Sequence, residues 1–422
     1  MPILFQFGVP FVSPTLGQVQ NSSPAWEAGL STDDKILEIN GRKIHGFRHI
    51  NSAIALSSQG STLPVKLERN GVIENISLKP EYDSNQGFST IGISPAYNIQ
   101  LAETSLVKKE LGDYSELIAI NGISLDNFLG STLALRSLIS GKDFSILSKN
   151  EFGETKLFNF SAKDYLNTNV GPTLLGVQVM QQEVENCKGF LANKLIAGDL
   201  IKAVNNNLIS SLDDILIEAS KQSEASQLLI VRNGEELTLD IPAMPAHEWQ
   251  RNLSLKANTD LSYWVHPLSA AADAGLKSGV QILRANNQPV TSIADLQEIM
   301  LNREEGSALE IVTLSSKGNE TNTVSITPKP TPQLELGLML APHKTKVVAT
   351  SFGESIQLGY REAYSMVRDV VTTAKRLISG EVAAKNMGGI ISIGVNKKPL
   401  SKFSFFCKNP LLFNKEILLN IN

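Results

Sequence analysis

The chain of 422 residues contains only two cysteines, Cys187 and Cys407. Because these lie far apart in the sequence, we propose no bridge between them, and a fold built on a disulfide framework is excluded. The remaining composition, with 42% hydrophobic and 19% charged residues, is ordinary for globular domains. A chain of this length predicts several domains.

The sequence also lacks an excess of positive charge and any long apolar run. Its net charge is −4, whereas nucleic-acid binding needs a concentrated basic face, so nucleic acid is not expected as a partner. No run of about 18 apolar residues occurs, and hydropathy therefore predicts no membrane span. Residues 1–14 have neither a basic start nor a small-residue cleavage site, so no signal peptide is predicted.

What the sequence does contain is one unit repeated four times. The first copy runs from Pro24 through Ala28-Gly29-Leu30 and an acidic turn to a period-2 strand, Ile36–Ile39, that ends in a tight turn at Asn40-Gly41. The asparagine of this turn recurs at Asn121, Asn205 and Asn286, at intervals of 81, 84 and 81 residues. A nearly constant interval over four copies indicates tandem domains.

Each copy continues with a helix and a hairpin. Apolar periodicity predicts helices over residues 49–56, 125–139, 212–220 and 293–301. Asn70-Gly71 and Asn233-Gly234 predict hairpins with type I′ turns in the first and third copies. The second and third copies lack a clear Ala-Gly-Leu and are the most degenerate.

This unit resembles the core of a bacterial PDZ domain, whose usual form is a small-residue run, Ala-Gly-Leu, a short strand and an Asn-Gly or Asp-Gly turn. The resemblance implies a mixed α+β fold of tandem PDZ-like modules, each a small, partly open β-barrel or sandwich with helices. The expected boundaries are 1–97, 98–170, 171–246 and 247–332 for four modules, 333–394 for a helical junction segment, and 395–422 for an unassigned tail. The resemblance also implies that the helix after the turn forms one wall of a peptide groove, which places His49 and Ala53 on that wall.

Triplets of the form apolar-Gly-apolar match the carboxylate-binding loop of PDZ domains, in which glycine lets backbone N–H groups point at the terminal carboxylate of a peptide. They occur at Phe7-Gly8-Val9, Ile91-Gly92-Ile93 and Leu175-Gly176-Val177, with the glycines 84 and 84 residues apart. A glycine in an ordinary strand is the alternative for each. Because PDZ domains occur in circularly permuted forms, the sequence leaves open whether a triplet opens the following module or closes the preceding one. For the first repeat, the expected loop is Phe7, Gly8 and Val9.

A more specific resemblance follows the last repeat. Arg376–Val382 reads Arg-Leu-Ile-Ser-Gly-Glu-Val, and Asn386–Ile390 reads Asn-Met-Gly-Gly-Ile. Both are similar to the segments that follow the PDZ domains in intramembrane zinc proteases of the site-2 protease family, although Ile390 stands where that family has proline. A helix is expected from Glu354 to Ser379. Its charges leave two interpretations open, a membrane junction and an amphipathic surface helix.

The catalytic residues of that family are absent from this sequence. Site-2 proteases need His-Glu-x-x-His on a helix and an Asp-Gly dipeptide, which together supply three zinc ligands and a general base. His45 and His49 have the right spacing, but Gly46 stands where the glutamate must be. His247-Glu248 begins the motif, but Arg251 occupies the second ligand position, and no Asp-Gly occurs. We therefore predict no catalytic residue, no metal ligand and no cofactor in this chain, and zinc is implied only for the intact family.

Two functions remain open from the sequence. The first is PDZ-mediated recognition of extended peptides or protein C-termini within a site-2-protease-like protein, of which this chain is expected to be a fragment. The array would then control the access of membrane-protein substrates, with its modules outside the cytoplasm and a membrane contact through residues 354–379. The second is a stand-alone, soluble PDZ scaffold that binds partner proteins.

Overall fold

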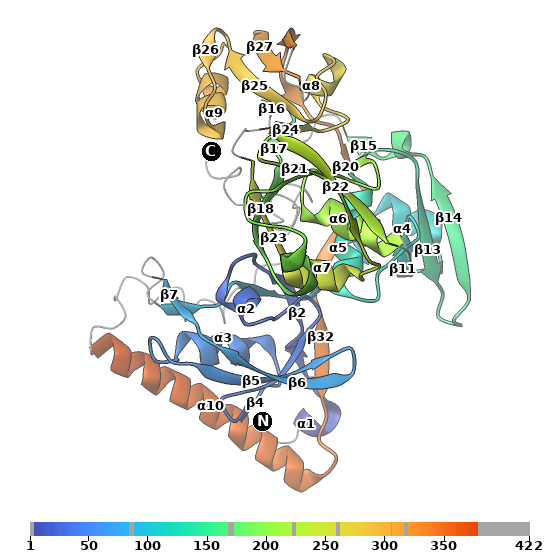
Figure 1. Cartoon of the computed structure of the whole chain (residues 1–422). Coiled ribbons are helices and arrows are strands. Elements are labelled where there is room, and N and C mark those ends of the chain that lie inside the picture. The colour runs from blue at the N-terminus through green and yellow to red at the C-terminus, as the bar shows by residue number, and fades with distance from the viewer. Residues whose placement is uncertain are drawn as a thin grey trace. The chain divides into compact units, whose positions relative to one another are not determined.

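The computed structural model describes residues 4–83, 88–167, 173–221, 225–258, 262–304, 306–315 and 320–378 (Figure 1). The described residues divide into two compact units: unit 1 comprises those of 1–98 and 340–378, and unit 2 those of 99–339. Strands β10 (Tyr97–Leu101) and β31 (Leu338–Pro342) contain the points where the chain passes between the units. The predicted junction motif Asn386–Ile390 and the tail 395–422 lie outside the described residues.

Unit 1 contains the first repeat and the segment that follows the fourth. Its elements are α1 (Leu4–Phe7), β1 (Val9–Val12), β2 (Leu16–Val19), α2 (Pro24–Glu27), β3 (Lys35–Ile39), β4 (Arg42–Lys43), α3 (Phe47–Ala55), β5 (Leu63–Arg69), β6 (Val72–Leu78), β7 (Glu81–Asp83), β8 (Phe88–Thr90), β9 (Ile93–Pro95), β32 (Lys344–Val347) and α10 (Phe352–Ile378). An antiparallel sheet has the order β4-β3-β5-β6, and β2 pairs with β9. Inward-facing residues of this sheet and of α2 and α3, among them the buried Trp26, form one core.

Unit 2 contains the second, third and fourth repeats. The second has α4 (Leu106–Leu111), β11 (Glu116–Ile120), β12 (Ile123–Ser124), α5 (Phe128–Ser137), β13 (Phe144–Lys149) and β14 (Thr155–Phe160). The third has β18 (Gln181–Cys187), β19 (Leu200–Val204), β20 (Asn207–Leu208), α6 (Leu212–Lys221), β21 (Ser226–Arg232), β22 (Glu235–Ile241), α7 (Ala246–Asn252) and β23 (Leu253–Ala257). The fourth has β24 (Ser262–Val265), α8 (Ala270–Asp273), β25 (Val280–Ala285), β26 (Gln288–Pro289), α9 (Ile293–Leu301), β27 (Leu309–Leu314) and β28 (Thr321–Ile326). Short pairs join β15 (Leu166–Asn167) to β30 (Gln333–Leu334) and β16 (Thr173–Leu174) to β29 (Lys329–Pro330). The predicted mixed α+β fold, with a helix after each Asn turn and a hairpin after each helix, is confirmed.

The apolar-Gly-apolar triplets complete modules to which the sequence alone could not assign them. Ile91 and Ile93 belong to the first core, and β9 pairs with β2, so this triplet closes the first repeat. Leu175-Gly176-Val177 does not belong to the third repeat, which follows it in the sequence. The strand β17 (Val177–Val179) pairs instead with β24 of the fourth repeat. Residues 173–179, placed by the sequence within 171–246, therefore contribute to the fourth repeat. A later triplet, Leu336-Gly337-Leu338, lies against the second.

The same contact recurs in these three repeats. Each triplet glycine has a positive φ and lies against the serine that caps the first short helix of the repeat, in the pairs Gly92 with Ser23, Gly337 with Ser105, and Gly176 with Ser269. A β-carbon on these glycines would lie 2.5, 2.7 and 2.1 Å from the serine β-carbon, respectively. No larger residue fits without displacing the cap, so a packing requirement accounts for the regular glycines.

Replacing Gly176 by alanine should therefore destabilise unit 2 more than a positive φ alone explains. Gly153 is the matched control, because it has a φ of +86° and no atom within 4 Å of the added β-carbon. We expect Gly153→Ala to lower the unfolding free energy by about 1 kcal/mol and Gly176→Ala by about 3 kcal/mol. Urea denaturation measures both, and equal losses would contradict the contact.

His266, just before the cap of α8, predicts a pH dependence. Burial lowers the pKa of His266 to about 4, and its Nδ1 accepts a hydrogen bond from the Leu268 N–H. In the unfolded chain a histidine titrates near pH ~6.5. Between these pH values the unfolded state binds more protons, so the stability contributed by neutral His266 is complete above the unfolded pKa and is lost as the pH falls toward the folded one.

We accordingly expect the unfolding free energy of unit 2 to fall on the order of 2 kcal/mol more in the wild type than in His266→Asn when the pH is lowered from neutral to about 4. Asparagine keeps an acceptor near the Leu268 N–H but does not titrate. Denaturation curves at several pH values measure the difference, and parallel curves for the two proteins would disprove it.

Candidate functional site

The candidate site is built on α3 of the first repeat. This helix buries Phe47, Ile50 and Ile54 in the core of unit 1, which fixes its rotation. Ala53 is half-buried at the edge of that core, and the His49 side chain is 8% exposed on the same flank, one turn before it. The structure thus brings together the two helix residues that the sequence places on a groove wall, while their role in binding stays a prediction.

His49 occupies a position with the same local hydrogen bond in three repeats. Its Nδ1 accepts from the backbone N–H of His45, at 3.2 Å. In the third and fourth repeats an aspartate does the same: Asp214 accepts from the Ser210 N–H at 2.6 Å, and Asp295 from the Thr291 N–H at 2.7 Å. Side chains at this point of a helix commonly satisfy a free N–H before the first turn. Because Nδ1 of His49 accepts, neutral His49 carries its proton on Nε2, which is free to donate elsewhere.

That Nε2 lies against a carboxylate from α10, which runs beside α3 in unit 1 (Figure 1). Glu362 lies 3.0 Å from His49 Nε2 and also accepts a hydrogen bond from Arg48. Burial alone would raise the pKa of Glu362, but the hydrogen bond from His49 and the charge of Arg48 outweigh it and lower the pKa. Burial, with the neighbouring His49, lowers the pKa of His45. Arg48 and His49 therefore form a donor pair that holds an ionised carboxylate.

The triplet Ile91-Gly92-Ile93 lies in the same module as α3. Its carbonyls are used internally, since Ile91 accepts from the Ala25 N–H and Gly92 from the Gln20 N–H. In the part of the chain that the structure describes, the Gly92 N–H has no acceptor. Among the described strands β9 pairs only with β2, so its other edge carries no strand. β8, which leads into the triplet, packs against α3.

Phe7-Gly8-Val9 has a different environment. Phe7 ends α1 and is 79% exposed, and Gly8 has a φ of +87°. A β-carbon on Gly8 would lie 3.1 Å from the Val348 side chain. Val9 begins β1, which pairs antiparallel with β32 of the same unit, Val9 facing Val347 and Val12 facing Lys344. One edge of the strand after this triplet is therefore already occupied by the chain itself, and peptide binding by these three residues stays a prediction.

Helix α10 turns its polar face to unit 1 and its apolar face outward. Ser355 is buried and Glu362 and Asp369 are largely covered, whereas α10 contributes one long series of exposed apolar side chains. These are Phe352, Ile356, Tyr360, Tyr364, Met366, Val367, Val370 and Val371. A surface helix of a soluble domain normally has the opposite arrangement. Among the residues that the structure describes, the outward face of α10 therefore has no apolar partner.

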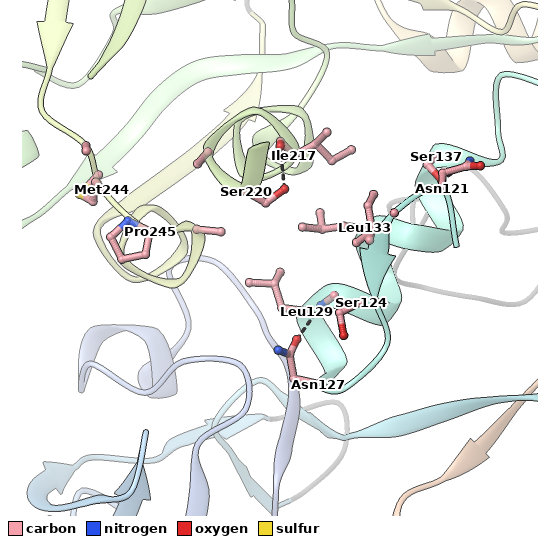
Figure 2. A pocket seen from close by; sticks show the side chains of 16 residues that line it. Asn121, Ser124, Asn127, Leu129, Leu133, Ser137, Ile217, Ser220, Met244 and Pro245 are labelled. Carbon is pink, nitrogen blue, oxygen red and sulfur yellow. Dashed lines mark hydrogen bonds between the residues drawn. The ribbon is translucent and has the colours of Figure 1, made fainter. Parts of the chain in front are cut away.

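In unit 2, the helices that correspond to α3 in the second and third repeats lie beside each other. Arg136 of α5 is paired with Asp213 and Asp214 of α6. Figure 2 shows Leu129 and Leu133 of α5 pointing into a pocket of about 970 Å³ that is also lined by Ile217 of α6 and by residues 243–246. Leu133 is part of the core of the third repeat, so the second and third repeats share buried apolar surface.

The described residues contain no cluster of three or more histidine, cysteine, aspartate or glutamate side chains that could hold a metal ion. The sequence excludes His45, His247 and Arg251 as parts of a zinc motif. In the structure the His45 ring packs against Phe11, and His247 and Arg251 both lie against Glu248. The side chains that the structure describes therefore do not form a zinc site. No helix in the ranges the structure describes is long and apolar enough to span a bilayer.

Two features of the site could not be predicted from the sequence. Glu362 lies 313 residues from His49, and no local pattern relates them. Phe11, whose ring centroid is 5.9 Å from that of His49, is one apolar residue in a short strand. The only available signal is that the polar residues of α10 recur on one helix face, as expected of a face with a polar partner.

Comparison with known proteins identifies the first module. The PDZ domain family model matches residues 6–79. A protein of Clostridium acetobutylicum named as a zinc metalloprotease is 33% identical over 84 residues, which is 20% of this chain and 24% of that protein. The regulator of sigma-W protease RasP of Bacillus subtilis is 34% identical over 90 residues, which is 21% of each chain. This chain thus matches about a quarter or less of the length of these two relatives.

Similarity also extends to a second class of protease. A DegP-like periplasmic serine endoprotease of Chlamydia pneumoniae is 27% identical over 156 residues, which is 36% of this chain and 30% of that protein. The first repeat of this chain is a PDZ domain, and the predicted resemblance of the chain to site-2-type zinc metalloproteases is confirmed over that region.

Proposed function

We propose that the first repeat recognises an extended peptide, which adds as a strand to the open edge of β9 beside α3. The observation that carries this proposal is that, among the described strands, β9 is paired on one side only, while α3 presents Ala53 and His49 in the same module. Main-chain hydrogen bonds would supply the affinity, and the side chains of α3 the selectivity. This is the recognition mode typical of the PDZ domain to which residues 6–79 belong.

The chemistry of the triplet fits a terminal carboxylate. The Gly92 N–H has no acceptor among the described residues, and its positive φ of +74° turns the backbone sharply at the start of β9. Backbone N–H groups in such a turn bind anions. Ile91, Gly92 and Ile93 would therefore hold the end of the peptide, and Phe7, Gly8 and Val9 would border the module on the side covered by β32.

In the whole protein, this recognition would act on substrates of a site-2-type protease. The similarity to named zinc metalloproteases supports this setting, and the PDZ array would select or delay the segments that reach the catalytic site supplied by the rest of the protein. Zinc would belong to that site and not to the residues described here.

The outward face of α10 supports a membrane contact for this segment. That face combines exposed Val367 and Val370 with Tyr360 and Tyr364, whose stacked rings have centroids 6.2 Å apart. Arg361 and Lys375 are exposed, Glu354 accepts hydrogen bonds from Thr350 at the start of the helix, and Glu362 and Asp369 are engaged in ion pairs. An apolar face with basic residues suits the interface of an anionic bilayer.

Filling the flank of α3 should weaken peptide binding. Ala53→Arg adds a long side chain to the flank of α3 on which His49 lies, and we expect a loss of about tenfold or more in affinity for C-terminal peptides. Asn51→Arg, an exposed position of the same helix, is the matched control and should bind as the wild type does. Fluorescence anisotropy against a C-terminal peptide library measures the affinities, and thermal melts check folding. Equal affinity of both variants for every bound peptide would disprove the site.

Charge on the outward face of α10 should prevent vesicle binding. We expect the wild-type chain to float with phosphatidylglycerol vesicles, and Val367→Asp to reduce the bound fraction about fivefold, because a carboxylate opposes burial in the interface. Gln357→Asp adds the same charge at an exposed polar position and serves as the control. A wild-type chain that stays at the bottom of the gradient would refute the membrane contact.

A further inference from the structure

The contact between α10 and α3 has the form of a ligand bound to a receptor. Arg48 and His49 converge on one carboxylate, that of Glu362, and the proton on His49 Nε2 is fixed there by the hydrogen bond from the His45 N–H to Nδ1. His49 is 8% exposed and Glu362 13%, so the pair is largely shielded from water. His49 lies one turn before Ala53 on the flank of α3 that faces a bound peptide in the proposed function, and Arg48 is its neighbour in the chain.

We propose that α10 is an internal ligand of the first repeat: Glu362 occupies a carboxylate-binding position on α3, and a partner segment with an acidic side chain binds there only when α10 leaves. The proposal rests on the proposed function, since it adds a regulator and a chemical preference to the same site. The partner is an extended peptide with a glutamate or aspartate placed to reach Arg48 and His49.

A second repeat supports the assignment of this helix position as a contact point. Asp214 of the third repeat stands where His49 stands in the first, and makes the same bond to the backbone N–H four residues earlier. Its carboxylate is paired with Arg136 from α5 of another repeat. In both repeats a charged side chain from a different segment pairs with the residue at this position. Glu362 pairs with His49 and its neighbour Arg48, and Arg136 pairs with Asp214.

Release of α10 from unit 1 requires little free energy. Its polar face lies on unit 1, and the apolar cluster beneath its first turns contains only Leu358, Phe5 and Ala349 as buried members among the described residues. The other large apolar side chains described for residues 352–375 are exposed. Undocking α10 therefore exposes little apolar surface, and the ion pairs of Glu362 are the main interactions that must be replaced.

The experiment uses the full chain and a fluorescent peptide of residues 352–375. We expect the Glu362→Gln chain to bind this peptide at least ~10-fold more tightly than the wild-type chain, in which α10 already fills the site. A peptide with the same substitution should bind the Glu362→Gln chain ~10-fold more weakly, because it lacks the carboxylate. Hydrogen exchange of the α10 amides in the full chain should also accelerate in Glu362→Gln.

The matched control is Glu68→Gln, which removes an exposed carboxylate of unit 1 that is paired with Lys35. It should leave peptide affinity and α10 exchange unchanged. Equal affinity of wild-type and Glu362→Gln chains for the peptide, or no binding to either, overturns the proposal. Binding of C-terminal library peptides equally to both chains would do so as well while leaving the proposed function intact. Binding of the α10 peptide alone, with no library peptide able to compete, would support the internal ligand and refute peptide recognition at β9.

Discussion

The close approach between a triplet glycine and a capping serine is the constraint on which the arrangement of the repeats depends. In three repeats the serine caps the first short helix with its side chain, and the glycine lies directly on its β-carbon. Backbone N–H groups just before this short helix donate to the triplet carbonyls. Gln20 donates to Gly92 and His266 to Gly176, and these bonds hold the two segments together. The contact therefore aligns the closing strand with the module that receives it.

A hydrogen bond at the N-terminus of the helix after the Asn turn is the second feature that recurs. A side chain three positions into the helix accepts from the backbone ahead of it, and in the fourth repeat Asp295 and Ser292 form a complete capping box. Hydrogen bonds from Thr291 and Ser292 lower the pKa of Asp295 to about 2, which keeps it ionised. Histidine in the first repeat keeps this local bond through one ring nitrogen and offers the other to a distant group. His49 in the first repeat thus combines the local bond with a contact to Glu362, as Asp214 in the third combines it with a contact to Arg136.

Much of the fold follows from local sequence patterns. The Asn turns locate the repeats, and the helix predicted over 293–301 is found at Ile293–Leu301, because apolar periodicity and a serine cap act over a few residues. The partner of Leu175-Gly176-Val177 could not be predicted, since three residues fit any of the modules and the choice is made by tertiary packing. For the candidate site, the resemblance to PDZ domains placed His49 and Ala53 on one wall of α3, but Glu362 could not be predicted, because nothing local links it to that helix.

The long path of the chain between the halves of one module has a consequence for synthesis. Ser105 of the second repeat receives its glycine from position 337, after the third and fourth repeats have been made. A ribosome adds about 5–20 residues per second, so the second repeat waits on the order of 10 to 50 seconds for its closing segment. During that interval the edge of β10 that later pairs with β31 is available to other chains. Folding of the complete array depends on this edge staying unpaired until the fourth repeat has been translated.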